Sequence, residues 1–182
     1  MIRGNVYEMA LEAYMQWHRI PYVAVNETRR SFLADERVKS LDFLVISARD
    51  QKLLIDVKGH RYPGGNPERP RRVWECWAKT SDIDGLERWA DHLGPEFRPL
   101  LVFVYQLATG IAAPDGEELW TWHDHKYLLR AIDAREYRQA MRRRSPRWGT
   151  VWLAKKDYDR LAQPFPFFLR EPAWSLDDAV PF

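Results

Sequence analysis

Cysteine is almost absent from this sequence, since Cys76 is the only one among 182 residues. A single thiol excludes a disulfide within the chain, so a reducing, cytoplasmic location is the simplest expectation. An excess of charge of one sign is also missing, because 28 Lys and Arg residues oppose 26 Asp and Glu residues and leave a net charge of +2. The overall charge therefore indicates no class of partner.

Long apolar runs are missing as well. The most apolar segment, residues 100–107, is far shorter than the roughly 20 residues that cross a bilayer. Residues 1–15 include Glu8 and Glu12 and contain no apolar stretch, so we expect neither a signal peptide nor a membrane span. A P-loop is excluded, because Gly64-Gly65 is not followed by Lys and then Ser or Thr.

What is present fits a globular α/β protein. Hydrophobic residues make up 46% of the chain and charged residues 30%, which are ordinary values. The length predicts one domain, residues 1–182. Within it we expect a core of residues 5–108 and a C-terminal elaboration of residues 109–182.

Apolar periodicity predicts a core with the order α-β-β-β-α-β. The predicted elements are a helix behind an Asn5 cap, strands at residues 21–26, 41–48 and 52–57, a helix from Ser81 to Gly94 with Asp84 at its third position, and a strand at residues 100–107. Segments 26–39 and 59–72 are predicted to be loops. The elaboration is predicted to add strands and two helices, the first capped by Asp133.

Two aspartates occupy strands that are otherwise apolar. Asp42 precedes Phe-Leu-Val, and Asp56 ends the next strand before Val57 and Lys58. A turn at residues 49–51 would place Asp42 opposite Asp56 or Lys58. Two carboxylates about 5 Å apart repel each other, and a divalent cation between them removes the repulsion. Carboxylate oxygens suit Mg²⁺ or Mn²⁺.

The same residues also fit an ion cluster without a metal. Burying an unpaired carboxylate costs several kcal/mol, and Lys58 would offset that cost by pairing with Asp42 or Asp56. In a metal site, by contrast, the Lys58 ammonium would orient a water molecule or stabilise charge on a phosphate. The spacing alone leaves both interpretations open.

Asp42, followed by thirteen residues and then by Asp56-Val57-Lys58-Gly59, resembles the signature of the PD-(D/E)XK nuclease superfamily. The predicted order of elements is similar to the restriction-endonuclease-like core of that superfamily, which implies a mixed central sheet. The resemblance implies that Asp42, Asp56 and the Val57 carbonyl ligate Mg²⁺ or Mn²⁺. It also implies that Lys58 assists the attacking water and that Glu8 completes the site. Leu41 stands where the motif has Pro.

A second resemblance begins in the first predicted helix. The segment Val6–Tyr14, VYEMALEAY, is similar to the HYExAFE pattern that names a family of uncharacterised bacterial proteins, and residues 19–25 and 40–43 support it. Val6 and Leu11 stand where the pattern has His and Phe, so no role of that His carries over. Glu8 also has a structural interpretation, because it follows Asn5 by three residues and can close a capping box.

Basic residues cluster after the candidate site. Five of them are predicted to bind the phosphate backbone of a nucleic acid: Arg61, Arg69, Arg71, Arg72 and Lys79. A second basic segment spans Arg135–Arg147. Each cluster also fits a solvated surface, and the neighbouring tryptophans fit core packing as well as base stacking.

The sequence thus predicts a metal-dependent endonuclease that hydrolyses phosphodiester bonds, with DNA as its partner and Mg²⁺ or Mn²⁺ as its cofactor. A homodimer is compatible with this architecture. The alternative is a catalytically inactive nuclease fold that binds nucleic acid or a protein partner. Dependence on a divalent metal distinguishes the two hypotheses, because only the enzyme requires the ion.

Overall fold

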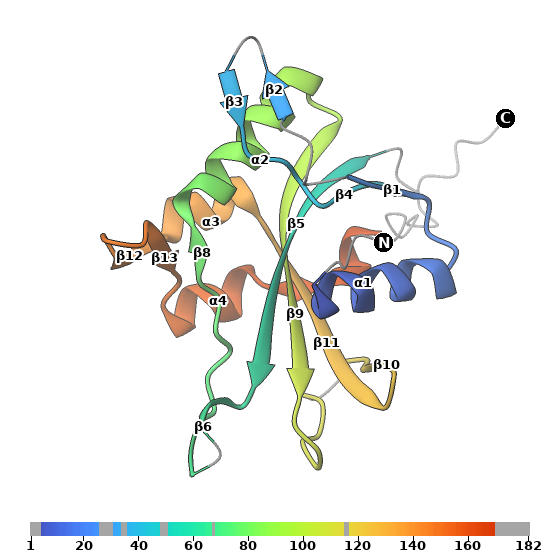
Figure 1. Ribbon diagram of the computed structural model, residues 1–182, viewed down its shortest axis with the longest axis vertical. Helices are drawn as coiled ribbons and strands as arrows, with labels where there is room; N and C mark the ends of the chain where they lie inside the picture. The colour runs from blue at the N-terminus through green and yellow to red at the C-terminus, as the bar shows by residue number, and fades with distance from the viewer. Residues whose placement is uncertain are drawn as a thin grey trace, which may run out of the picture.

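A curled central sheet with helices on both faces forms the body of the protein (Figure 1). The computed structural model describes residues 5–25, 31–33, 36–47, 51–66, 68–114 and 117–169. In spatial order the sheet contains β1 (Tyr22–Ala24), β4 (Phe43–Ile46), β5 (Lys52–Tyr62), β9 (Phe97–Leu107), β11 (His125–Asp133) and β10 (Trp120–Trp122), and β14 (Gln163–Pro164) pairs with β11.

The sheet is mixed, as predicted. β4 runs antiparallel to β5, with Phe43 opposite Ile55. β5 runs parallel to β9 along its whole length, from Lys52 opposite Phe97 to Tyr62 opposite Leu107. β11 then pairs antiparallel with β9. The parallel pair needs a crossover, which α2 (Thr80–Leu93) supplies, so the predicted order α-β-β-β-α-β is confirmed in α1, β1, β4, β5, α2 and β9.

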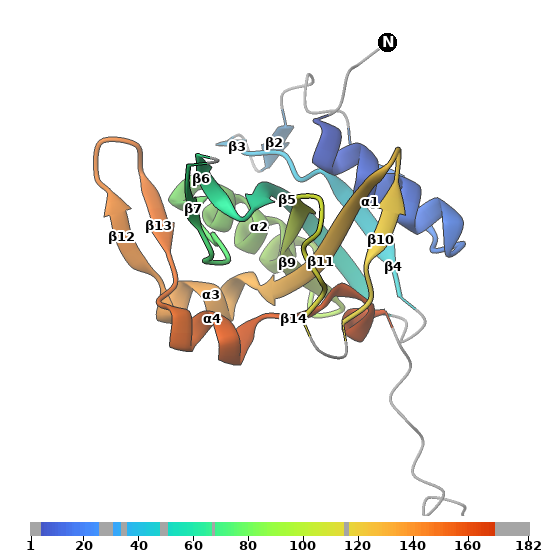
Figure 2. The same ribbon diagram turned by 90° about the horizontal axis from the view of Figure 1, so that it is seen from below.

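Helices cover both faces of the sheet. α1 (Val6–Trp17) lies on one face with the short 3₁₀ helix η1 (Phe165–Phe168), and α2, α3 (Ala134–Ala140) and α4 (Lys155–Leu161) lie on the other (Figures 1 and 2). α1 buries Leu11, Tyr14 and Met15 against the sheet. On the other face Phe103 of β9 lies in one core cluster with Tyr137 and Tyr158. The sheet is therefore buried on both sides, which explains its continuous apolar strands.

Two small hairpins lie in segments that were predicted to be loops, and a further small sheet forms outside the central one. β2 (Ser31–Leu33) pairs with β3 (Glu36–Val38), and β6 (Gly64–Asn66) pairs with β7 (Arg69–Arg71). β8 (Ala78–Lys79) joins β13 (Thr150–Trp152) and β12 (Arg142–Ser145) in a separate sheet. Strands of two to four residues are too short to show a periodic pattern, so the loop predictions for residues 26–39 and 59–72 were wrong at these positions.

The start of α2 also differs from the prediction. The helix begins at Thr80, and its third position is Asp82 rather than Asp84. Asp82 Oδ2 accepts a hydrogen bond from the Lys79 backbone N–H at 3.1 Å. The earlier aspartate therefore satisfies a main-chain donor at the helix start. Among the described helices none is long and apolar enough to cross a membrane.

Candidate active site

The end of the β4–β5 hairpin brings two buried aspartates together. The pairing of Phe43 with Ile55 continues by one residue, so Asp42 lies opposite Asp56. The Asp42 N–H donates to the Ile55 carbonyl at 2.8 Å, and Asp42 Oδ2 accepts from the Val57 N–H at 2.5 Å. Asp42 is 7% exposed and Asp56 1%. These main-chain hydrogen bonds fix the Asp42 carboxylate beside β5.

Lys58 follows on the same face of β5 and pairs with Asp56 Oδ2. Two further charged side chains, Lys39 and Asp82, complete an alternating arrangement that we call the four-charge cluster (Lys39, Asp56, Lys58 and Asp82). Lys39 Nζ lies 2.7 Å from Asp56 Oδ1 and 2.6 Å from Asp82 Oδ1. Lys58 Nζ lies 2.5 Å from Asp82 Oδ2. Each ammonium therefore bridges the two carboxylates.

The ionisation of the cluster follows from this pairing. Burial opposes the charge of Asp82, but Lys58 and Lys39 hold the pKa of its carboxyl below the ordinary value. Burial likewise opposes the charge of Lys39, but Asp56 and Asp82 hold its pKa above the ordinary value. The surrounding ion pairs therefore favour the charged forms of Lys39 and Asp82.

Lys39 and Asp82 were not among the predicted site residues. Lys39 precedes β4, and Asp82 belongs to the first turn of α2, so their approach to β5 depends on tertiary packing. The sequence feature that could have revealed Asp82 is an aspartate in the first turn of a helix. The prediction gave that position to Asp84, which instead pairs with Arg138 on the helix surface.

A cleft of about 300 Å³ opens beside the four-charge cluster. Its lining includes Lys39, Lys58 and Asp82 of the cluster, and also His60, Trp77 and Lys79. His60 is 7% exposed, and burial is the main reason why its pKa is lowered to about 4, with Glu75 opposing the shift and Arg144 and Lys58 adding to it. Its imidazole is therefore neutral at pH 7. The cleft thus presents ammonium groups to a ligand.

Glu8 closes the capping box of α1. Its Oε2 accepts from the Asn5 N–H at 3.3 Å, and Asn5 Oδ1 accepts from the Tyr7 N–H at 3.2 Å. The first turn of α1 nevertheless lies close to the site, because Asn5 lines the cleft. The structural interpretation of Glu8 thus agrees with this geometry, and its role toward a metal stays a prediction.

The site contains the oxygen ligands that a divalent metal prefers, but these oxygens already make hydrogen bonds or ion pairs within the protein. Asp42 and Asp56 supply hard oxygen ligands from adjacent strands, and Val57 lies between Asp56 and Lys58 on β5. Both oxygens of Asp56, however, pair with a lysine. Within the described part of the chain, no three His, Cys, Asp or Glu side chains form a group that could hold a metal ion. A cation at Asp56 must therefore compete with an ammonium.

The five predicted basic residues are exposed, and one of them lines this cleft. Arg61 ends β5 and Lys79 lines the cleft itself, whereas Arg69, Arg71 and Arg72 belong to the β6–β7 hairpin and the residue after it. Part of the second basic segment is neutralised, since Arg135 pairs with Asp91, and Arg138 with Asp84 and Glu87. The remaining arginines of that segment lie on and beside the β12–β13 hairpin.

Comparison with known proteins gives a similarity of structure rather than of sequence. No protein-family model matches the chain, and no curated protein matches its sequence. The structure is similar to that of Hjc, a Holliday junction resolvase from the archaeal hyperthermophile Archaeoglobus fulgidus, with a TM-score of 0.54 and 10% sequence identity. The similarity covers 92% of this chain and 100% of the resolvase. The chain therefore has the mixed α/β fold of a nuclease, as its sequence predicted.

Proposed function

We propose that this protein is a metal-dependent nuclease that hydrolyses phosphodiester bonds in DNA. The observation that carries the proposal is the convergence of Asp42, Asp56 and Lys58 at the end of the β4–β5 hairpin, in a fold shared with a Holliday junction resolvase. The pattern of these residues agrees with the PD-(D/E)XK signature. Membership of the HYExAFE family, suggested by residues 6–14, belongs to the same proposal.

Asp42, Asp56 and the Val57 carbonyl would hold Mg²⁺ or Mn²⁺. When bound, such an ion polarises a phosphate and lowers the pKa of a coordinated water. Lys58 is 14% exposed at its side chain and lines the cleft, so its ammonium can hold a phosphate oxygen or the attacking water. Asp82 pairs with Lys58 and holds its ammonium in place, so it acts as a positioning residue.

In this proposal, exposed basic residues supply affinity for the DNA backbone. Each phosphate contact by Arg or Lys releases a counterion, so binding should weaken steeply as salt concentration rises. Arg61, Arg69, Arg71, Arg72 and Lys79 are assigned to these contacts.

One observation favours a second candidate function. Because the lysines already neutralise both oxygens of Asp56, the four-charge cluster is complete without a metal. In that case the fold binds DNA or a protein partner and performs no hydrolysis. This alternative predicts salt-dependent DNA binding that needs no divalent ion.

Cleavage assays test the nuclease proposal directly. Linear, branched and single-stranded DNA are incubated with Mg²⁺ or Mn²⁺ and with the wild type, Asp56→Ala or Lys58→Ala. We expect both variants to lose at least a hundredfold in cleavage rate, as is common when a charged group of a catalytic site is removed. Asp84→Asn is the matched control, because Asp84 lies on the surface of α2. Equal cleavage by the wild type and Asp56→Ala would show that the activity comes from a contaminant or from another site.

Calorimetric titration with Mn²⁺ separates the two candidate functions. Removing the Lys39 ammonium frees one oxygen of Asp56, so Lys39→Ala should bind Mn²⁺ at least about tenfold more tightly than the wild type. Asp42→Ala should lose binding. If neither the wild type nor Lys39→Ala binds millimolar Mn²⁺, the metal site is wrong and the alternative function stands.

A further inference from the structure

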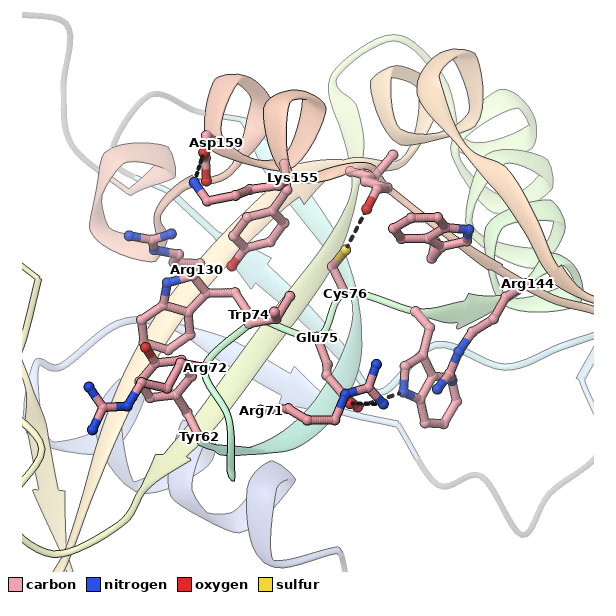
Figure 3. A pocket seen from close by; sticks show the side chains of 15 residues that line it. Tyr62, Arg71, Arg72, Trp74, Glu75, Cys76, Arg130, Arg144, Lys155 and Asp159 are labelled. Carbon is pink, nitrogen blue, oxygen red and sulfur yellow. Dashed lines mark hydrogen bonds and ion pairs between the residues drawn. The ribbon is translucent and has the colours of Figure 1, made fainter. Parts of the chain in front are cut away.

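A second concave site, which we call the aromatic pocket, lies where the C-terminal elements meet the segment between β7 and β8 (Figure 3). Its volume is about 460 Å³, within the usual range for a small-molecule ligand. Five aromatic side chains contribute to the lining: Tyr62, Trp74, Trp77, Trp152 and Tyr158. Arg71 and Arg72, which the sequence predicts to bind nucleic acid, line it as well.

The inner wall of the aromatic pocket is already ordered by its own contacts. Tyr62 and Trp74 stack with ring centroids 3.7 Å apart and planes 13° from parallel. Arg130 lies over both Trp74 and Tyr158, at 5.3 and 5.7 Å from the ring centroids. Glu117 holds Arg130 in place through a hydrogen bond of 3.0 Å to its Nε. These flat side chains therefore form a rigid surface on which a planar ligand can stack.

Cations surround the opening of the aromatic pocket. Arg71, Arg72, Arg144 and Lys155 line it and are exposed, and the acidic lining residues are Glu75 and Asp159. Asp159 pairs with Lys155, and Glu75 lies 4.0 Å from Arg71. The excess of positive charge favours an anionic ligand. Aromatic faces within a cationic rim suit a nucleotide, which combines a planar base with a phosphate.

Cys76 does not give the pocket a redox or nucleophilic function. Its Sγ donates to the Leu153 carbonyl at 3.6 Å. Burial is the main reason why the pKa of its thiol is raised to about 11, so the thiolate is scarce at neutral pH. The chemistry of the pocket is therefore that of binding.

Trp77 connects the aromatic pocket to the candidate active site. It lines both the pocket and the cleft beside the four-charge cluster. Its ring meets that of His60 edge-on, with centroids 5.3 Å apart, and Arg144 lies 5.1 Å from its centroid. A nucleic-acid strand that occupies the cleft thus lies next to the opening of the pocket.

We propose that the aromatic pocket binds a single unstacked nucleotide of a DNA strand whose backbone passes through the adjacent cleft. The proposal rests on the proposed function and specifies its substrate class: DNA with an unpaired nucleotide close to the bond that is cleaved. A free mononucleotide presents the same base and phosphate, so the experiment includes it as a separate arm. The shared wall at Trp77 favours the strand over the free nucleotide.

Binding without cleavage tests the proposal. Fluorescence anisotropy in EDTA compares a duplex that contains one unpaired adenosine with a fully paired duplex of the same length. We expect the wild type to prefer the first duplex by at least about fivefold, the lower end of what stacking of one base on an aromatic side chain supplies. Trp152 is 40% exposed, so Trp152→Ala should fold and should bind both duplexes equally.

Two further variants make the result specific. Trp17→Ala removes a tryptophan that is 75% exposed on α1 and does not line the pocket, so it should keep the fivefold preference. Arg72→Gln removes a rim charge from an exposed position and should weaken the binding of free dAMP, measured by quenching of tryptophan fluorescence. The wild type should bind dAMP, and Trp152→Ala should not.

The outcomes separate the pocket from the nuclease proposal. Equal affinity of the wild type for the two duplexes overturns the assignment to an unpaired strand nucleotide, even if dAMP binds. If the wild type does not bind dAMP and shows no preference for the duplex with the unpaired nucleotide, the assignment of the pocket to a nucleotide is wrong. A preserved preference in a protein that cleaves no DNA supports the pocket and contradicts only the nuclease proposal.

Discussion

Single residues of the candidate site compensate one another's charge. Asp56 and Asp82 are 1% and 3% exposed, and removing an ion from water costs several kcal/mol in a protein interior. Lys39 and Lys58 offset this cost by bridging both carboxylates. The loss of one member should therefore lower the stability of the protein, because it leaves a buried charge with fewer partners.

The buried side chain of His60 should make the stability of the protein depend on pH. Because its pKa is lowered to about 4 in the folded protein, the unfolded chain binds a proton between pH 6.5 and 4 that the folded protein does not bind. The free energy of unfolding should therefore fall as the pH drops through this window, by at most about 3 kcal/mol. Urea unfolding at pH 7 and pH 5 measures the change.

The matched comparison uses two substitutions. His60→Phe keeps a ring that can stack near Phe103 and Tyr105, and it should flatten the pH dependence in this window. His92→Asn removes an exposed histidine of α2 and is the control for the replacement of a histidine. If His60→Phe and the wild type have the same slope, His60 is not the group responsible.

The residues of the site differ in how visible they are in the sequence. Asp42, Asp56 and Lys58 could be predicted, because charged residues in otherwise apolar strands are rare and their spacing fits one hairpin. Lys39 and Asp82 could not, because neither interrupts an apolar pattern. Trp74 and Trp77 were assigned to nucleic-acid binding or to the core without distinction, and only their tertiary neighbours show the cavity between them.

At the scale of elements, contact between α1 and β5 depends on a glycine. A Cβ at Gly59 would lie 2.0 Å from Tyr7 Cδ2 and 2.2 Å from Tyr7 Cγ, which is far closer than atoms can approach. Cγ is close to the main chain, so it can move away only if the Tyr7 side chain changes its χ1 rotamer or the helix shifts. Gly59 thus allows the first turn of α1 to lie against the strand that carries Asp56 and Lys58.

Gly59→Ala should consequently destabilise the protein. We expect a loss of about 1–3 kcal/mol in the free energy of unfolding, typical of overpacking, measured by urea denaturation. Tyr7→Ala should relieve the clash, so the double variant should be more stable than the sum of the two single effects predicts. At Gly64 the nearest atom to a new Cβ is Glu75 Oε1 at 3.4 Å, so Gly64→Ala is a matched control with a smaller effect.

Long elements were predictable and short ones were not. The periodicity of α1 and the apolar runs of β4, β5 and β9 are strong local signals. The β6–β7 hairpin contains Gly and Pro, which are typical of loops, and Gly65 takes a positive φ of 83° at the turn. In a hairpin with three-residue strands, the residues typical of turns outweigh those typical of strands, so the sequence predicts a loop.

At the scale of the whole molecule, the C-terminal part is built into the central sheet. β11 pairs with β9 from Lys126 opposite Leu107 to Asp133 opposite Leu100, and η1 completes the core beneath α1 with Phe165 and Phe168. The expected core of residues 5–108 and the expected elaboration therefore follow each other along the chain but share one sheet and one hydrophobic core. The elaboration also supplies Arg130, Trp152 and Tyr158 to the aromatic pocket.

A chain that ends at Ala108 should therefore fail to fold. It would expose the edge of β9 and the apolar residues under α3 and α4, and unpaired apolar edges associate. We expect little soluble protein and no cooperative thermal transition by far-ultraviolet circular dichroism, with the full chain as the control. A cooperative transition in the truncated chain would show that the first six core elements are an independent folding unit.

β5 also fixes a distance. Lys58 and Tyr62 are four residues apart on one continuous strand that pairs with β9 at both positions, which separates them by about 13 Å. That is close to four base-pair rises of a duplex. A DNA backbone bound at Lys58 and a nucleotide bound near Tyr62 would be separated by a strand rather than by a loop, so their distance would be constant. Cleavage of such a substrate would then occur at a fixed number of nucleotides from the unpaired one.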